Sequence, residues 1–136
     1  MASPGKLMHS CTLPLRWGDM DAYGHVNNVT YIRYLEEARV QMLTRMGTGL
    51  EGADQAPVVI NVGFTFLQQL TYPDSVRVEC YAADPGRSSF MVNYRLFAES
   101  APEALAGEGY SKVVWIDRRT GRSVTLPDAV RSQLEN

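Results

Sequence analysis

The sequence is poor in the residues that bind metals or form disulfides. Its 136 residues include two cysteines, Cys11 and Cys80, and two histidines, His9 and His25. None of the four stands at the spacing of a C-x-x-C or H-x-x-x-H motif, which argues against a metal site. We therefore expect no metal and no disulfide, and we expect both cysteines to be small buried side chains.

Long apolar runs and blocks of basic charge are also missing. The purely apolar stretches are too short to span a membrane, and the N-terminal segment MASPGKLMHS lacks the apolar stretch of a secretory signal. The 13 basic and 15 acidic residues are scattered, with a formal net charge of −2, so no surface is expected to neutralise a row of phosphates. We expect a cytoplasmic protein that neither inserts into membranes nor binds nucleic acid.

What the sequence does contain is enough apolar material for one core, since 45% of its residues are hydrophobic. We expect a single domain over residues 1–136. Apolar residues alternate from His9 to Trp17, which predicts a half-buried strand, and Pro14 places that strand at an edge or a bulge. From about residue 28 to 46 they recur every three or four positions, which predicts a helix.

The segment after this helix alternates with period two and is divided by turn signals. The turn DPGR, residues 84–87, predicts an antiparallel hairpin. A strand, a long helix and then consecutive antiparallel strands indicate an α+β domain, with one sheet of five or six strands wrapping one helix. The expected later elements are strands at 58–66, 76–82, 90–96, 104–117 and around Val124, and a closing helix at 126–136 with Pro127 in its first turn.

The stretch DMDAYGHVNNVTYIRYLEEAR, which begins at Asp19, holds more polar side chains than a helix start requires. Each of them, taken singly, has a local use as a cap, a turn or a bend. A helix start needs one capping oxygen, however, and this stretch provides several together with a histidine. The excess indicates a site, whose candidate residues are Asp19, Asp21, Gly24, His25, Asn27 and Asn28.

A helix N-terminus offers unpaired N–H groups and partial positive charge, which suit an oxygen that becomes negative during a reaction. A carboxylate placed upstream, such as Asp21, could act as a general base or as a nucleophile on the same carbonyl carbon. His25 would donate a hydrogen bond or position the reacting groups, and we consider it a poorer base than Asp21. The pattern thus favours acyl transfer.

The sequence also contains weaker patterns for two other kinds of site. The segment GYSKV, residues 109–113, lacks the last glycine of a nucleophile elbow and does not lie on a strand-to-helix turn, so a serine triad is not expected. Asp19 and Asp21 form a D-x-D pair that could bind Mg²⁺, but no phosphate-binding glycine loop accompanies them.

The stretch RWGDMDAYGHVNNVTYIRYLEEAR resembles the signature of the 4-hydroxybenzoyl-CoA thioesterase family of hotdog-fold acyl-CoA thioesterases. The resemblance covers the end of the first strand, the D-x-D-x-x-G-H-V-N-N segment and the Y-x-x-Y-L-E-x-A-R helix. It implies a hotdog fold, in which a curved antiparallel sheet wraps a long helix, and a homodimer or a dimer of dimers, that is, a homotetramer. It also implies an acyl-CoA or acyl-carrier-protein thioester as substrate, and no cofactor.

The same resemblance implies roles for single residues. Asp21 falls on the catalytic carboxylate, and the backbone amide of Asn28 falls on the oxyanion donor. Gly24 matches the glycine that lets the substrate approach, while His25 and Asn27 belong to the H-V-N-N form of the motif.

Four further positions follow from the resemblance. Tyr23 stands where plant enzymes carry an asparagine, and we expect it at the substrate. Arg87, in the segment GRSSF, matches a basic turn that helps to hold CoA. Glu36 and Arg39 match a helix pair that we interpret as structural partners within the dimer.

Two alternative functions remain open at this point. One is a hotdog hydratase or dehydratase acting on acyl thioesters, because a fold alone does not settle function. The other is a noncatalytic dimer that binds acyl-CoA.

Overall fold

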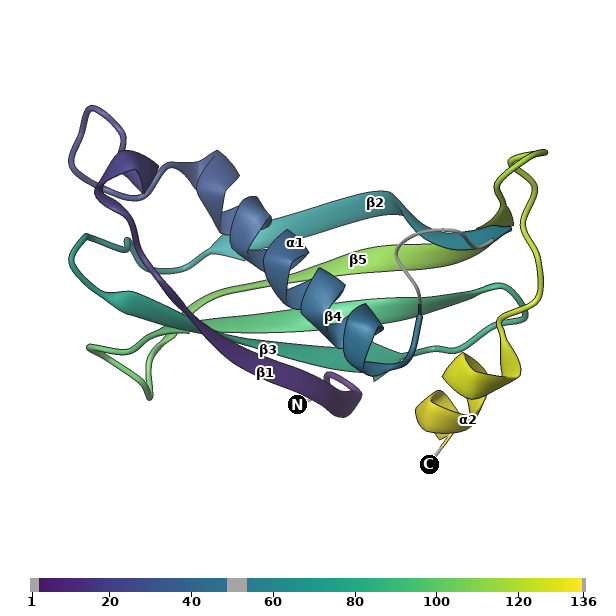
Figure 1. The fold of residues 1–136 in the computed structure, drawn as a ribbon. Helices are drawn as coiled ribbons and strands as arrows, with labels where there is room; N and C mark the ends of the chain where they lie inside the picture. The colour runs from purple at the N-terminus through teal and green to yellow at the C-terminus, as the bar shows by residue number, and fades with distance from the viewer. Residues whose placement is uncertain (1–2, 49–53, 136) are drawn as a thin grey trace.

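The computed structural model describes residues 3–48 and 54–135. Five antiparallel strands in the order β1-β3-β4-β5-β2 form one curved sheet, and the long helix α1 lies across its concave face (Figure 1). This is the predicted α+β arrangement, with β1 and β2 at the two edges. The elements are β1 (Lys6–Pro14), the short 3-10 helix η1 (Trp17–Asp19), α1 (Asn28–Arg45), β2 (Gln55–Phe66), β3 (Ser75–Ala83), β4 (Ser89–Ala98), β5 (Leu105–Asp117) and α2 (Asp128–Glu135).

The first strand is shifted relative to its prediction. It ends at Pro14 instead of Trp17, because the chain turns into η1, where the Arg16 N–H donates to Asp19 Oδ2 at 3.0 Å. Proline has no N–H to continue a ladder, so its position at the end of an edge strand agrees with its chemistry. The prediction that Pro14 marks an edge strand is therefore confirmed.

The predicted strand around Val124 is wrong. Only an isolated bridge joins Ser123 to Ile116, and the Val124 N–H donates to the Trp115 carbonyl at 2.9 Å. Two residues farther on, the Leu126 N–H bonds the Arg87 carbonyl instead of β5, so pairing stops before a strand forms. The closing helix is confirmed over Asp128–Glu135, although Pro127 lies just before its first residue; Asn136 falls outside the described residues.

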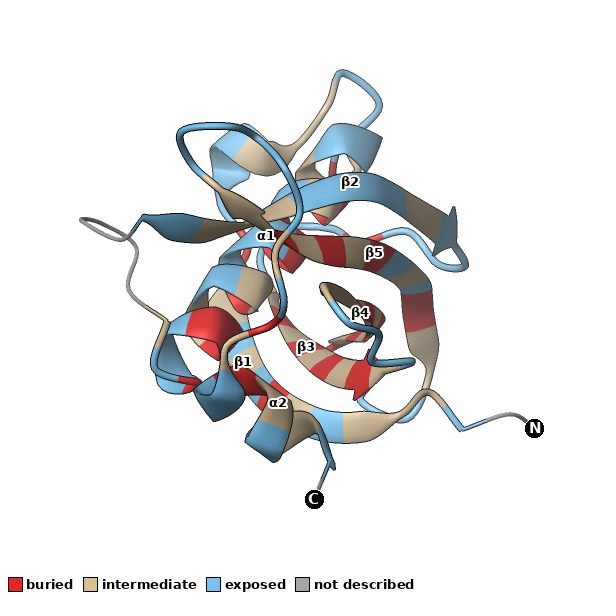
Figure 2. Ribbon diagram, turned by 90° about the vertical axis from the view of Figure 1, so that its right-hand side faces the viewer, coloured by how far each residue is buried: buried red, intermediate tan, exposed pale blue. Residues whose placement is uncertain are grey.

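The core lies between α1 and the inner face of the sheet. Strands β3 and β4 alternate between buried and half-buried residues, as the striped colouring in Figure 2 shows. Cys80 is fully buried there, and burial raises the pKa of its thiol to about 12. The helix contributes one buried stripe, made up of Tyr31, Tyr34, Leu35, Ala38, Met42 and Leu43.

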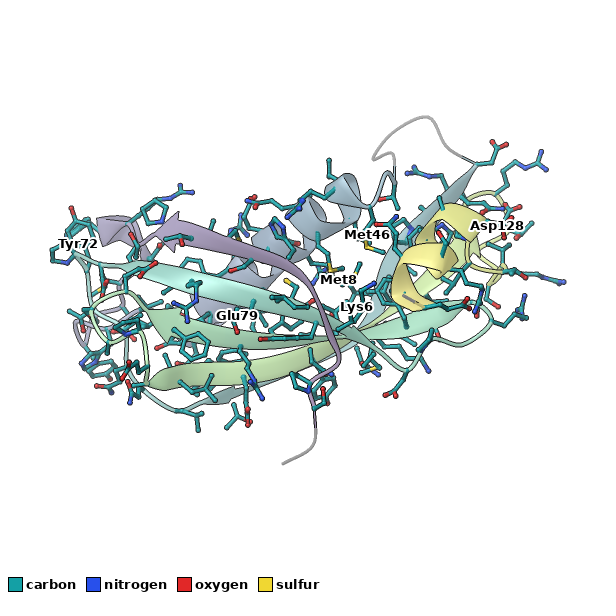
Figure 3. The ribbon with its side chains drawn as sticks, turned by 90° about the horizontal axis from the view of Figure 1, so that it is seen from below. Lys6, Met8, Met46, Tyr72, Glu79 and Asp128 are labelled. Atoms are coloured by element: carbon teal, nitrogen blue, oxygen red, sulfur yellow. The ribbon has the colours of Figure 1, made fainter. Side chains whose placement is uncertain are left out.

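The molecule has two different ends. At one end α2 covers the C-terminus of α1: Lys6 Nζ donates to the Gln133 carbonyl at 2.6 Å, and Gln133 Nε2 donates to the Met46 carbonyl at 2.9 Å. Figure 3 shows Met46 and Lys6 beside α2, with Tyr72 at the far end of the molecule. The N-terminus of α1 lies at this far end, where β2 finishes and β3 begins (Figure 1).

Candidate active site

The N-terminus of α1 is built by two consecutive asparagines with different tasks. The Asn27 side chain caps the helix, because its Oδ1 accepts the Val29 N–H at 2.9 Å, and its own N–H donates to the Asp19 carbonyl. The N–H of Asn28, the first residue of the helix, has no hydrogen-bond partner among the residues that the structure describes. It is one of the unsatisfied donors that every helix start presents.

A tight turn fixes the Asp21 carboxylate in front of this helix end. Its Oδ1 accepts the Tyr23 N–H at 2.8 Å and the His25 N–H at 3.4 Å, while the backbone of Asp21 bonds back to His25 and Gly24. Gly24 has a φ of +83°, a conformation that a glycine adopts without strain. These bonds engage one carboxylate oxygen and leave Oδ2 without a protein donor in the described part of the chain.

The turn, the helix start and the end of β2 enclose a cavity of about 390 Å³. Four predicted site residues line it, namely Asp21, Tyr23, His25 and Asn28, and Gly24 and Asn27 lie within the same loop. The residues of the cavity wall are Asp21, Tyr23, His25, Val26, Asn28, Tyr31, Phe66, Leu67, Gln68 and Gln69.

Tyr31 ties the floor of this cavity to α1. Its hydroxyl donates to the Gln68 carbonyl at 3.0 Å and accepts the Leu70 N–H at 3.1 Å, and its ring packs against Phe64 and Phe66. Burial raises the pKa of the Tyr31 hydroxyl. The loop after β2 is therefore held in place under the helix end, so Gln68 presents its side chain on a fixed backbone.

Sequence reasoning missed the wall formed by Leu67, Gln68 and Gln69. They lie 46 to 48 residues after Asp21 in the chain, and only the path of β2 across the sheet brings them there. A pair of glutamines directly after an apolar strand was the only local signal.

The two aspartates of the D-x-D pair do not converge. Asp21 lines the cavity just described, whereas Asp19 lines a separate cavity of about 400 Å³ between α1 and the end of β1. Within residues 3–48 and 54–135, moreover, no group of three or more histidine, cysteine or acidic side chains is arranged to hold a metal ion. The donor set thus gives no support to the magnesium alternative.

Arg87 is not brought to Asp21 within one chain. It lies on the β3–β4 turn, where its guanidinium donates to Thr125 Oγ1 at 3.1 Å and to Ser123 Oγ at 3.3 Å. Phe66 faces Gly107 on β5, whereas the start of β4 pairs with Val114. Seven residues of strand separate these rows by about 23 Å.

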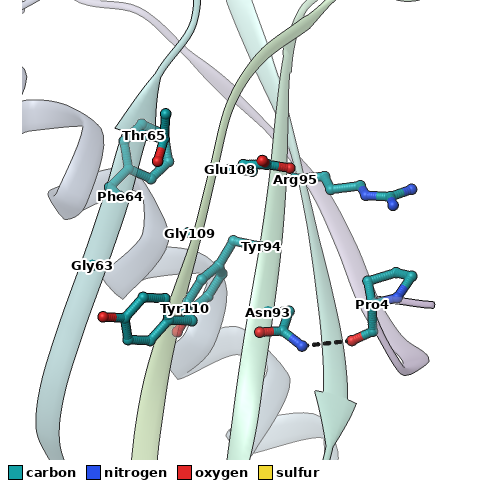
Figure 4. A pocket seen from close by; sticks show the side chains of 10 residues that line it. All are labelled: Pro4, Gly63, Phe64, Thr65, Asn93, Tyr94, Arg95, Glu108, Gly109 and Tyr110. Atoms are coloured by element: carbon teal, nitrogen blue, oxygen red, sulfur yellow. Dashed lines mark hydrogen bonds between the residues drawn. The ribbon is translucent and has the colours of Figure 1, made fainter. Parts of the chain in front are cut away.

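A third cavity, of about 310 Å³, lies on the outer face of the sheet (Figure 4). The Tyr110 ring lies over Gly63, and Asn93 Nδ2 donates to the Pro4 carbonyl at 2.7 Å. No residue of the helix start contributes to it. It therefore lacks the pairing of a carboxylate with free backbone donors that marks the Asp21 cavity.

One finding concerns membranes: no helix in the described part of the chain is long and apolar enough to span one.

Comparison with known proteins gives the family. The sequence model of a protein family, the thioesterase-like superfamily, matches residues 15–134 of this chain. The solved PA2801 protein from Pseudomonas aeruginosa, a proposed thioesterase, is 44% identical, with a TM-score of 0.90 over 94% of this chain and 98% of that chain.

Two curated proteins are more distant relatives. The long-chain acyl-CoA thioesterase FadM of Escherichia coli is 25% identical over 132 residues, which are 90% of this chain and 94% of that protein. A 1,4-dihydroxy-2-naphthoyl-CoA hydrolase from Picosynechococcus is 29% identical over 126 residues, or 87% of this chain and 86% of that protein. With the family match, the predicted resemblance is confirmed: the chain belongs to the thioesterase-like superfamily and is a hotdog-fold thioesterase.

Proposed function

We propose that the protein hydrolyses acyl-CoA thioesters to a free acid and CoA, with Asp21 and the helix start as the catalytic apparatus. One observation carries this proposal: the Asp21 carboxylate and the unpaired Asn28 N–H lie in the wall of the same cavity. The curated relatives are named for hydrolysis of acyl-CoA thioesters, which agrees with this substrate class.

The Asn28 N–H is proposed to bind the thioester carbonyl oxygen. Charge builds up on this oxygen when the carbonyl carbon is attacked, and the positive end of α1 stabilises that charge. The capping oxygen, Asn27 Oδ1, accepts the Val29 N–H and not the Asn28 N–H, so the Asn28 N–H is free to bind the carbonyl oxygen.

Asp21 is proposed to act through Oδ2, since Oδ1 is engaged by the backbone of its own turn. As a general base, Oδ2 takes a proton from the attacking water, the C–S bond breaks, and the proton passes to the departing CoA thiolate. As a nucleophile, Oδ2 attacks the carbonyl carbon and forms a mixed anhydride while the C–S bond breaks and CoA leaves as the thiolate; water then opens the anhydride and supplies the proton that the thiolate takes up. Both routes give the same products.

The remaining residues of the turn have supporting roles in this proposal. Gly24 keeps the approach to Asp21 open, because it carries no side chain on the exposed side of the turn. Tyr23 and His25 line the cavity mouth and contact the pantetheine arm, and Asn27 acts through the helix cap.

We further propose that the active protein is at least a homodimer formed through β2. This edge strand is mostly exposed and carries Val59, Ile60 and Val62 with exposed fractions of 37%, 57% and 44%. Exposed apolar edges invite pairing with another strand. Pairing two copies of β2 antiparallel would extend the sheet across both chains, and two such dimers could form the tetramer that we expect.

Such pairing would also give Arg87 its predicted role. Antiparallel β2 strands place the Arg87 end of one copy beside the Asp21 end of the other. Arg119 and Arg122 lie at the same end, on the turn after β5, which is joined to the start of β2 by the Arg118 N–H and the Asp54 carbonyl. This basic end of the second copy is proposed to hold the CoA phosphates.

The test is a release assay for free thiol over a series of acyl-CoAs, aryl ones included, with wild-type protein and Asp21→Asn. We expect turnover to fall by about a hundred- to ten-thousand-fold in the variant, with an unchanged circular dichroism spectrum. Undiminished turnover by the variant would remove Asp21 from the mechanism. A single turnover in heavy-oxygen water detects the anhydride route: label in the Asp21 carboxylate requires that water opened an anhydride at the Asp21 carbonyl carbon, which the general-base route never does.

The same protein preparation tests the alternatives. A hydratase would convert an enoyl-CoA while leaving CoA attached, which mass spectrometry of the product detects. A noncatalytic binding protein would bind acyl-CoA in a calorimeter and return it uncleaved.

A further inference from the structure

A second groove lies along the junction between α1 and β2. It has a volume of about 230 Å³. Its first residue along the helix is Val29, which follows the Asn28 that lines the Asp21 cavity, so both spaces begin at the same end of α1. Its lining residues are Val29, Ile32, Arg33, Glu36, Arg39, Val59 and Val62.

The walls of this groove change character along the helix. Near the helix start they are apolar, formed by Val29 and Ile32 opposite Val62. Farther along, three charged side chains follow at intervals of one helical turn: Arg33, Glu36 and Arg39. The first two are exposed, whereas Arg39 is half-buried and lies deepest.

Arg39 is held by a buried pair of hydroxyls. Its guanidinium donates to the Tyr94 hydroxyl at 3.3 Å, and that hydroxyl lies 2.5 Å from Ser111 Oγ. Tyr94 and Ser111 are 1% and 0% exposed. Among the described residues, 3–48 and 54–135, no carboxylate lies within 4.0 Å of the Arg39 guanidinium. A half-buried cation without an anionic partner is costly unless something supplies one.

The position of Arg39 sets a length. Eleven helical residues separate it from Asn28, about 16 Å along the axis. Helical side chains point back toward the N-terminus, so its guanidinium lies roughly 10 Å from the thioester carbonyl site. A medium-length acyl chain would span this distance along the apolar walls.

We propose that this groove receives the far end of the acyl group and that Arg39 selects medium-length acyl groups ending in a carboxylate. The inference rests on the proposed function and specifies its substrate class. A carboxylate there would pair with Arg39 in a partly desolvated site, where a charged hydrogen bond is strong. Arg33 and Arg39 outnumber Glu36, so the groove favours an anion. This replaces the interpretation of Arg39 as a structural partner of Glu36 in a dimer.

The test compares substrates of equal length that differ only at the far end: octanoyl-CoA with suberoyl-CoA, and decanoyl-CoA with sebacoyl-CoA. We expect wild-type kcat/KM to be at least about tenfold higher for the carboxylated member. Arg39→Met, which has a similar reach without charge, should remove this preference, whereas Arg39→Lys should retain part of it. Tyr94→Phe should weaken the preference, since it removes the hydroxyl that holds the guanidinium.

Binding provides a readout that does not need turnover. The same substrate pairs are titrated into Asp21→Asn protein, with and without Arg39→Met, in a calorimeter. Selective binding of suberoyl-CoA that depends on Arg39 supports the inference even if the catalytic role of Asp21 fails. Conversely, efficient hydrolysis with no preference for carboxylated chains overturns the inference and leaves the proposed function standing.

A control variant and the assembly state complete the design. Arg95→Met removes an arginine from the outer face of the sheet, where it lies over Tyr81, and should leave the substrate ratio unchanged. The molecular mass of Arg39→Met is measured by light scattering. If Arg39→Met lowers kcat/KM equally for all substrates, or dissociates the protein, Arg39 is a structural residue and the inference is wrong.

Discussion

The Tyr34 hydroxyl donates a hydrogen bond to Asp19 Oδ2 at 2.8 Å, and this bond separates the roles of the two aspartates in the motif. Tyr34 is 7% exposed and belongs to α1, while Asp19 closes η1 and also accepts the Arg16 N–H. Asp19 thus ties the entry loop to the helix from one side. Asp21, two residues later, faces the other cavity and keeps an oxygen available for chemistry.

The first prediction concerns Asp19. Asp19→Ala removes the acceptor for two donors, one of them buried, and we expect the free energy of unfolding to fall by about 1–3 kcal/mol. Urea denaturation followed by tryptophan fluorescence measures this. Asp21→Asn is the matched control, expected to lose turnover at unchanged stability. The separation of roles is contradicted if the two variants lose the same property.

The second prediction concerns the helix cap. Asn27→Ala removes the acceptor for the Val29 N–H and should cost about 1 kcal/mol of stability, whereas Asn27→Ser should restore most of it. Because the cap keeps the neighbouring Asn28 N–H in place, we also expect kcat to fall in Asn27→Ala and to recover in Asn27→Ser. An unchanged kcat in the alanine variant would show that the cap does not position the oxyanion donor.

Much of the fold could be predicted from the sequence because its strands and helix have strong, separate periods. The apolar period of three to four residues marks α1 to within a residue of its observed end. The segment around Val124 shows where such reasoning fails. A few apolar residues after a turn resemble a strand, yet whether they pair depends on which acceptor each N–H finds. Val124 bonds Trp115 on β5, but Leu126 bonds Arg87, which is far away in the chain.

The candidate site likewise has one part that the sequence predicts and one part that it does not. Asp21, His25 and Asn28 were predictable because they lie within one short segment whose local chemistry is redundant. The opposite wall was not, since Gln68 reaches the cavity only through the Tyr31 hydroxyl bonds. The distance between Arg87 and Asp21 could not be predicted either, because it depends on strand order and register.

The third prediction is a loss of stability at alkaline pH. Burial and the hydrogen bond to Asp19 raise the pKa of Tyr34 above its ordinary value of 10.0. The unfolded chain therefore releases this proton first, so stability is intact below pH 10 and falls as pH rises through and beyond that value. Urea titrations on both sides of pH 10 measure the slope. Tyr34→Phe should have a smaller slope, and an identical slope in the variant would contradict the assignment.

The last prediction concerns the glycines beneath Phe64. A Cβ on Gly107 would lie 2.3 Å from Phe64 Cζ and 3.1 Å from the Thr65 carbonyl oxygen, too close for either to remain in place. Gly107→Ala should therefore displace the Phe64 ring, which packs against Tyr31 at 5.6 Å between centroids, and cost about 1–3 kcal/mol of stability. Because Tyr31 holds the loop of Gln68, the displacement should also raise KM.

Gly18→Ala is the matched control, since a Cβ there meets nothing within 4 Å and should change neither stability nor KM. Equal stability and equal KM in the two variants would show that β5 has room for a side chain under Phe64, and that this aromatic cluster does not support the cavity wall.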